Sequence, residues 1–157
     1  MTSGAPRWLG RHLTGDDLAA ITQSITDAEA ATSAEIRVHL EPRVPRARFR
    51  RPLEPLDRAR ELFTALDMHR TRDRNGVLIY VALRDRKLAL VGDEGIHARV
   101  GDEYWASVRD QMVAHFRQGA SRDAIVRAVA DVGAALARHF ARRPDDVDEL
   151  PNTVSVE

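Results

Sequence analysis

The chain has 157 residues, a net charge of zero from 24 Lys and Arg against 24 Asp and Glu, and no cysteine. This length predicts a single domain. The balanced charge argues against a dedicated nucleic-acid binder, whose domain is usually strongly basic, and the lack of cysteine excludes disulfides and thiolate metal sites. The N-terminus has no apolar core of the length found in signal peptides, and no stretch approaches about 18 consecutive apolar residues. We therefore expect a cytoplasmic protein without a membrane span.

The N-terminal part is predicted to be a leader followed by a helix. Residues 1–13 form the flexible leader, in which Trp8 and Leu13 are expected to pack back onto the domain. Thr14 is predicted to cap a helix that extends to about Ala31, because two acidic residues follow in the first turn against the positive end of the helix dipole. Apolar residues at three- and four-residue spacing give this helix one buried face.

A strand, a loop and a second helix are predicted next. Apolar and polar residues alternate over Glu35–Leu40, which is typical of a strand. Four prolines in residues 41–55 predict a surface loop. The arginines of this loop suit a phosphate or an acidic partner, although charge runs are usually just solvated; they are Arg43, Arg46, Arg48, Arg50 and Arg51. Apolar spacing predicts a helix over residues 55–68.

Residues 75–95 are the most informative stretch. Two β-type runs, Val77–Leu83 and Lys87–Val91, flank a short charged turn and predict an antiparallel hairpin. Asn75-Gly76 opens this unit, and a glycine loop, Gly92–Gly95, closes it. The start of the first strand and the end of the second lie side by side in such a pair, so these two ends are expected to meet at one edge of the sheet.

Helical spacing predicts two further helices after the hairpin, over residues 102–117 and 121–142. Ser121-Arg122-Asp123 is expected to cap the second of them. Residues 143–157 are acidic and are predicted to form a mobile tail, with a short added edge strand at Thr153–Val156.

This order of elements predicts an α/β fold over residues 14–142. A strand, a helix and a second strand imply a parallel pair with a right-handed crossover, and the hairpin adds an antiparallel strand. Helices on both faces then give a three-layer α/β/α sandwich around a small mixed sheet, Rossmann-like but not the regular dinucleotide fold. The sequence has no G-x-G-x-x-G or Walker pattern, so no nucleotide cofactor is expected.

The predicted sheet edge carries a candidate metal site. Glu35, Asn75, Asp93 and Glu94 supply oxygen donors there, and hard cations such as Ca²⁺ take six to eight such ligands. The alternative is that the Asn and Asp residues only stabilise turns. Arg72 and Arg74 flank the site and are candidates for holding an anion, or are solvated surface charges. The six histidines show no close ligand spacing and are interpreted as structural.

Three segments carry a family resemblance. Ser33–Ile36 looks like an entry into a first strand, Asn75–Val81 like a second strand with the pattern NGVL, and Arg86–Ile96 like a third strand with a glycine loop after it. Together they resemble the TPM-domain family, named after a thylakoid-lumen protein, a photosystem II repair protein and a worm receptor modulator. The resemblance spans about residues 13–142 and is strongest to a short soluble bacterial branch.

The resemblance implies an α/β/α domain, and some members bind calcium or show weak acid phosphatase activity. In this chain Arg74 stands where many relatives have Asp, and His97 where an acid is common, so the edge carries less negative charge. The first hypothesis is a monomeric, non-catalytic accessory or regulatory module that acts through an unknown protein partner and is tuned by calcium.

The alternative is a weak metal-dependent acid phosphatase acting on phosphate monoesters, with Asp93, Glu94 and Asn75 as metal ligands and Arg74 as the anion clamp. No phosphatase signature surrounds the Asp and Ser residues of the chain. The catalytic residues of such an enzyme therefore stay unassigned at the level of the sequence.

Overall fold

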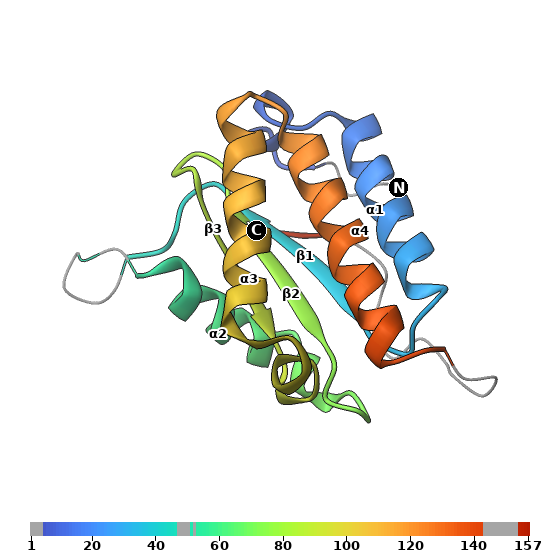
Figure 1. Ribbon diagram of the computed structural model, residues 1–157. Helices are drawn as coiled ribbons and strands as arrows, with labels where there is room; N and C mark the ends of the chain where they lie inside the picture. The colour runs from blue at the N-terminus through green and yellow to red at the C-terminus, as the bar shows by residue number, and fades with distance from the viewer. Residues whose placement is uncertain (1–4, 47–50, 52, 143–153) are drawn as a thin grey trace.

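The computed structural model describes residues 5–46, 51, 53–142 and 154–157 (Figure 1). The helices are α1 (Gly15–Glu29), α2 (Pro55–Ala65), α3 (Glu94–Arg117) and α4 (Ser121–His139), with short 3-10 turns η1 (Leu9–Arg11) and η2 (Met68–Arg70). The strands are β1 (Ile36–Glu41), β2 (Val77–Ala82), β3 (Lys87–Gly92) and β4 (Ser155–Val156). None of the described helices is both long and apolar enough to cross a membrane.

The strands form one mixed sheet in the order β3-β2-β1-β4. β1 runs parallel to β2 and to β4, whereas β3 is antiparallel to β2. Helices α1, α3 and α4 cover one face of this sheet and α2 covers the other (Figure 1). The predicted three-layer α/β/α sandwich with a parallel pair and an antiparallel hairpin is therefore confirmed.

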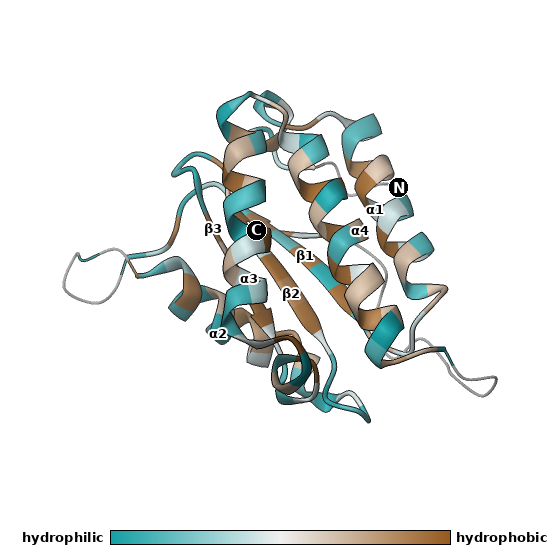
Figure 2. Ribbon diagram, in the orientation of Figure 1, coloured by the Kyte–Doolittle hydropathy of each residue, from teal (hydrophilic) through white to brown (hydrophobic). Residues whose placement is uncertain are grey.

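Strand β2 lies at the centre of the core. All six of its residues are buried because helices cover both faces of the sheet, and the visible part of the strand is coloured hydrophobic in Figure 2. Val77, Ile79 and Val81 pack toward α1, α3 and α4, while Leu78 and Tyr80 pack toward α2. The period-two alternation of a strand thus divides its side chains between two apolar layers.

The start of α1 agrees with the prediction. Thr14 is the N-cap, its hydroxyl accepts a hydrogen bond from the Asp17 amide at 3.1 Å, and the Asp17 carboxylate accepts from the Thr14 amide at 2.8 Å. This reciprocal capping box satisfies two amide groups that a helix start otherwise leaves unpaired. Leu13 is buried and Trp8 is partly buried against the core, so both act as the expected anchors.

The glycine loop predicted after β3 is wrong, because α3 begins there. Asp93 is the N-cap, and its Oδ1 accepts a hydrogen bond from the Glu94 amide at 2.7 Å. Gly101, with φ of 77°, interrupts the helical backbone at the point where the sequence predicted the helix to begin. Gly95 is helical, and a Cβ there would lie 2.6 Å from the carbonyl oxygen of Arg74. This glycine therefore serves close backbone packing and not loop flexibility.

Helix α4 also differs from its prediction. Ser121 is its first residue and not its cap, and the N-cap residue Ala120 makes no side-chain hydrogen bond. The predicted edge strand is confirmed for Ser155–Val156, which pairs with β1. Thr153, the acidic residues before it, and Arg48 and Arg50 of the arginine loop lie outside the described residues.

Candidate functional site

The candidate metal residues lie where β1 and β2 begin and β3 ends, a region that we call the entry edge. Backbone hydrogen bonds tie its segments together: the Val77 amide donates to the Glu35 carbonyl at 2.8 Å, and the Asp93 amide donates to the Gly76 carbonyl at 2.9 Å. The predicted meeting of these distant segments is therefore confirmed at the level of the backbone.

The four candidate side chains of the entry edge differ in exposure. Glu35 and Asn75 are buried, and the Asn75 amide group donates to the Ser33 hydroxyl at 3.4 Å. Asp93 is half-buried, and its Oδ2 atom is buried without a hydrogen-bond partner. Glu94 is exposed. Among these side chains, Asp93 thus combines partial access from solvent with an unsatisfied oxygen.

The carboxylate oxygens of the entry edge do not converge into a ready ligand set. Within the described part of the chain, Glu35, Asp93 and Glu94 do not form a group whose ligand atoms all lie within 4.8 Å of one another. Calcium is held by six to eight oxygens at about 2.3–2.6 Å. An ion at this edge would therefore need backbone carbonyls or water to complete its coordination.

The two candidate anion-binding residues, Arg72 and Arg74, are both exposed. Arg74 has a left-handed backbone with φ of 50°, and its Nη1 lies 3.6 Å from Glu94 Oε2. This pair is open to solvent, so it contributes only about 0–1 kcal/mol to stability. It nevertheless places a cation beside one of the predicted metal ligands.

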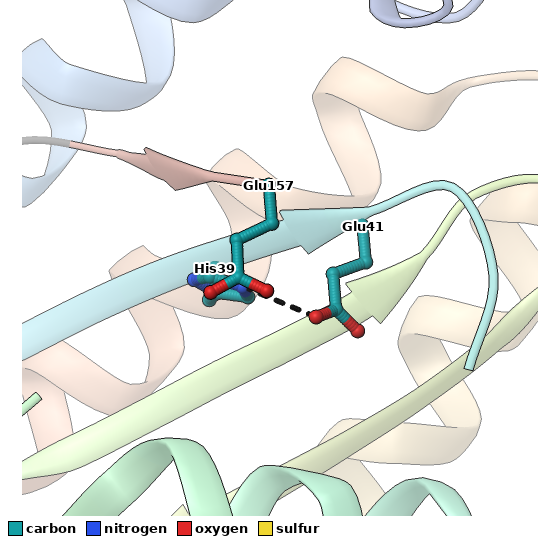
Figure 3. Close-up of side chains that lie close together, drawn as sticks. All are labelled: His39, Glu41 and Glu157. Carbon is teal, nitrogen blue, oxygen red and sulfur yellow. Dashed lines mark ion pairs between the residues drawn. The ribbon is translucent and has the colours of Figure 1, made fainter. Parts of the chain in front are cut away.

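A second polar cluster, which the sequence interpretation missed, lies at the other end of β1. We call it the exit edge. It consists of His39, Glu41 and Glu157, which Figure 3 shows, together with Arg58 and Tyr80, which hydrogen-bond to these carboxylates. Arg58 Nε lies 3.1 Å from Glu41 Oε1, and Arg58 Nη2 also contacts that oxygen. The Tyr80 hydroxyl donates to Glu41 Oε2 at 2.6 Å, and Arg58 Nη2 donates to Glu157 Oε2 at 2.9 Å.

The exit edge keeps Glu41 ionised although the residue is buried. Burial by itself raises the pKa of Glu41, but interactions with His39, Arg58 and Tyr80 outweigh it and hold the pKa well below its usual range. Burial and the hydrogen bond to Glu41 raise the pKa of Tyr80, so that its phenol stays protonated. The result is a buried carboxylate matched by a guanidinium and a neutral hydroxyl.

The exit edge also fastens the last strand to the sheet. His39 Nδ1 lies 2.8 Å from the Ser155 hydroxyl, and the Glu157 amide donates to the Leu40 carbonyl at 3.1 Å. His39 Nε2 is buried without a hydrogen-bond partner and lies 3.7 Å from Glu41 Oε1. These contacts join β4, β1 and the side chain of Arg58 from α2.

The exit edge has side chains of the types that bind metals, but its arrangement disfavours a metal ion. The ligand atoms of His39, Glu41 and Glu157 all lie within 4.8 Å of one another. Arg58, however, already binds both carboxylates. A divalent ion would meet the positive charge of this guanidinium and displace its hydrogen bonds. The arrangement is best explained as a structural ion-pair network.

A partial signal for the exit edge exists in the sequence. His39 and Glu41 are two residues apart in a strand, so their side chains share one face of the sheet. The prediction ended the strand at Leu40 and placed Glu41 in the loop, which hid this relation. Arg58 and Glu157 come from distant segments, and nothing local in the sequence places them beside Glu41.

Comparison with known proteins identifies the family. The family model described as the TPM domain matches residues 10–135. The chain belongs to the TPM-domain family. No curated protein matches the chain significantly.

Solved structures with the same fold include BA42 from the psychrophilic bacterium Bizionia argentinensis. It is 41% identical to this TPM domain, with a TM-score of 0.81 over 92% of this chain and 95% of that chain. The N-terminal domain of a protein from P. gingivalis is 20% identical, with a TM-score of 0.66 over 84% and 83% of the two chains. The N-terminal domain of cg2496 from Corynebacterium glutamicum is 11% identical, with a TM-score of 0.62 over 95% and 94%. The last two show the fold alone.

Proposed function

We propose that this TPM-domain protein is a non-catalytic accessory or regulatory module of the cytoplasm that acts through a protein partner and binds a divalent cation at the entry edge. The observation that carries the proposal is the state of Asp93. Its Oδ1 caps α3, while its Oδ2 is buried without a hydrogen-bond partner. A buried unpaired oxygen is costly, and a cation with its water shell would satisfy it.

Calcium is the best candidate for this ion. The other candidate donors of the entry edge are also oxygens: the carboxylates of Glu35 and Glu94 and the side-chain amide of Asn75. Carboxylate and amide oxygens suit hard cations, and calcium also accepts backbone carbonyls and water, which would complete its coordination where the side chains do not converge. The exposed pair between Arg74 and Glu94 would have to open on binding, which costs little because solvent already screens it.

The test is an amide NMR titration of the purified protein with Ca²⁺ and then with Mg²⁺. We expect saturable shifts centred on residues 74–76 and 92–95, with a dissociation constant up to the order of millimolar. The decisive variant is Asp93→Asn, because asparagine still caps a helix but lacks the charge. Asp110→Asn is the control, since Asp110 is an exposed carboxylate elsewhere on α3.

The outcomes separate the possibilities. Shifts that vanish in Asp93→Asn and persist in Asp110→Asn support the proposal. A spectrum unchanged up to millimolar ion, or shifts that survive Asp93→Asn, contradicts it.

A second candidate function is a weak metal-dependent acid phosphatase acting on phosphate monoesters. The observation that favours it is the position of Arg74, an exposed cation 3.6 Å from Glu94 and therefore beside the proposed ion. A metal ion and a nearby arginine together stabilise the charge of a transferring phosphoryl group. Saturable turnover of p-nitrophenyl phosphate that EDTA and Asp93→Asn each abolish would support this function. Turnover that survives both would come from a contaminant.

A further inference from the structure

A cavity of about 570 Å³ opens away from the entry edge, between the turn that joins β2 to β3 and the turn that joins α3 to α4. Both turns lie at the upper end of the molecule in Figure 1. The walls of this cavity include Val81, Leu88, Val113 and Phe116. Val81 is buried and the other three are partly buried, so the cavity has an apolar floor that remains open to a ligand.

The rim of this cavity is cationic. Arg86, Lys87 and Arg117 line it and are exposed, and no acidic residue lines it. None of the three forms an ion pair with any residue that the structure describes. Lysine and arginine usually find partners or full solvation, and three like charges around one opening repel one another. An anionic group would relieve this repulsion.

The electrostatics of His12 indicate the same positive potential. This histidine also lines the cavity. Burial lowers its pKa, and the charges of Arg84 and Arg11 lower it further. Helix α4 begins at Ser121 on the same rim, and its N-cap residue Ala120 offers no side-chain cap. The amides of that first turn have no side-chain cap and add to the positive potential of the rim, while Asp123 in the same turn offsets part of it.

A second large cavity, of about 680 Å³, shows that this charge bias is not general. It lies along β3 between α2 and α3, and it is lined by Arg60 and Arg109 but also by Glu54 and Asp102. Positive and negative side chains balance around this cavity, so we expect it to favour neither anionic nor cationic ligands. Only the cavity at the β2–β3 turn, of these two, combines an apolar floor with a rim of a single sign.

We propose that the cavity at the β2–β3 turn binds an anionic amphiphile, a small molecule with a carboxylate or phosphate head and an apolar body. The head would lie among Arg86, Lys87 and Arg117, where it gains charge-assisted hydrogen bonds. The body would cover Val113 and Phe116 and remove their apolar surface from water. A neutral lipid would contact only the apolar floor, and a free inorganic anion only the cationic rim. Each should therefore bind more weakly than a molecule that uses both.

The test is an amide NMR titration of the full chain with three probes: decanoate, inorganic phosphate and the uncharged amphiphile octyl glucoside. Decanoate should produce saturable shifts around residues 84–88 and 113–121. It should bind at least about tenfold more tightly than phosphate or octyl glucoside, because it uses both the rim and the floor. Its affinity should fall as salt screens the rim.

A pair of matched double variants isolates the rim. Lys87→Gln with Arg117→Gln removes two exposed charges from the cavity and spares Arg86, whose left-handed φ of 55° belongs to the turn. The control, Arg60→Gln with Arg109→Gln, removes the same charge from the balanced cavity. We expect the first pair to weaken decanoate binding by about tenfold and the second to leave it unchanged.

Three results would overturn the proposal. The first is an absence of saturable shifts with decanoate. The second is phosphate binding as tightly as decanoate, which would mean a simple anion site. The third is an equal loss of affinity in both double variants, which would mean non-specific attraction to the net charge of the protein.

Discussion

The two ends of β1 carry the same chemical groups but compensate them differently. At the exit edge, Glu41 is buried and Arg58 binds both this carboxylate and that of Glu157. At the entry edge, Arg74 pairs with the exposed Glu94, while Asp93 Oδ2 stays buried without a hydrogen bond. The buried carboxylate of the exit edge is thus matched by an internal cation, whereas the buried oxygen of the entry edge is not, and the proposed ion would bind at the unmatched one.

The largest expected effect tests the exit edge. We expect Arg58→Met to lower the free energy of unfolding by about 3–5 kcal/mol, because it leaves the buried carboxylate of Glu41 without its cation. The control is Arg60→Met on the same helix, since Arg60 is exposed and its pair with Asp57 spans 4.0 Å. The free energy of unfolding of Arg60→Met should differ from that of the wild type by no more than about 0.5 kcal/mol. Denaturant unfolding measures the stability of both variants. Equal losses of stability would mean that the buried ion-pair network contributes no more than an exposed ion pair.

The next effect concerns the backbone of the entry edge. We expect Gly95→Ala to destabilise the protein by about 1–3 kcal/mol, because the new Cβ would collide with the carbonyl oxygens of Asp73 and Arg74. Gly15→Ala is the control, since a Cβ there meets nothing within 4 Å and α1 begins at this residue. It should stabilise by about 0.4–1 kcal/mol. A Gly95→Ala protein as stable as the wild type would show that the two segments do not pack closely.

A pH effect follows from the two tyrosines of the chain, Tyr80 and Tyr104. Burial raises the pKa of both phenols, and hydrogen bonding to Glu41 raises that of Tyr80 further. Both folded-state pKa values lie above the unfolded value of about 10. The stability that the folded protein gains by keeping the two phenols protonated is therefore fully present below pH about 10. It is then lost as the pH rises toward the folded-state values.

Tyrosinate absorbance measures this directly. The native protein should show none near pH about 11, whereas the denatured chain should titrate near pH about 10. In Tyr104→Phe the remaining tyrosine, Tyr80, reports the exit edge alone. Titration of that variant near pH about 10 while it is still folded would contradict the burial of Tyr80 against Glu41.

The smallest expected effect is at the exposed pair of the entry edge. Glu94→Gln removes the partner of Arg74, and we expect the free energy of unfolding to change by less than about 1 kcal/mol. Set against Arg58→Met, this difference compares the loss of a partner at an exposed charge with the loss of a partner at a buried one. A loss as large as that of Arg58→Met would mean that the entry edge, too, is built around a structural ion pair.

Much of the fold was predictable because its signals are local. Thr14 caps α1 as expected, and the apolar run of β2 gives a strand that is buried on both faces. The meeting of Asn75-Gly76 with Asp93 was also predictable, because a short turn sets the register of an antiparallel pair. The start of α3 was missed because glycines at positions 92 and 95 are typical of a loop.

The sequence by itself determined the helices and strands, their order and the meeting of the two ends of the β2–β3 hairpin. These features depend on residues that are neighbours in the chain. Only the tertiary structure decided which charges are matched. Arg58 reaches Glu41 because α2 packs on the face of the sheet to which Tyr80 points, and Glu157 joins them because β4 pairs with β1. Partners that come from distant segments are set by packing, and it is this packing that pairs the buried carboxylate at one end of β1 and leaves Asp93 Oδ2 without a hydrogen bond at the other.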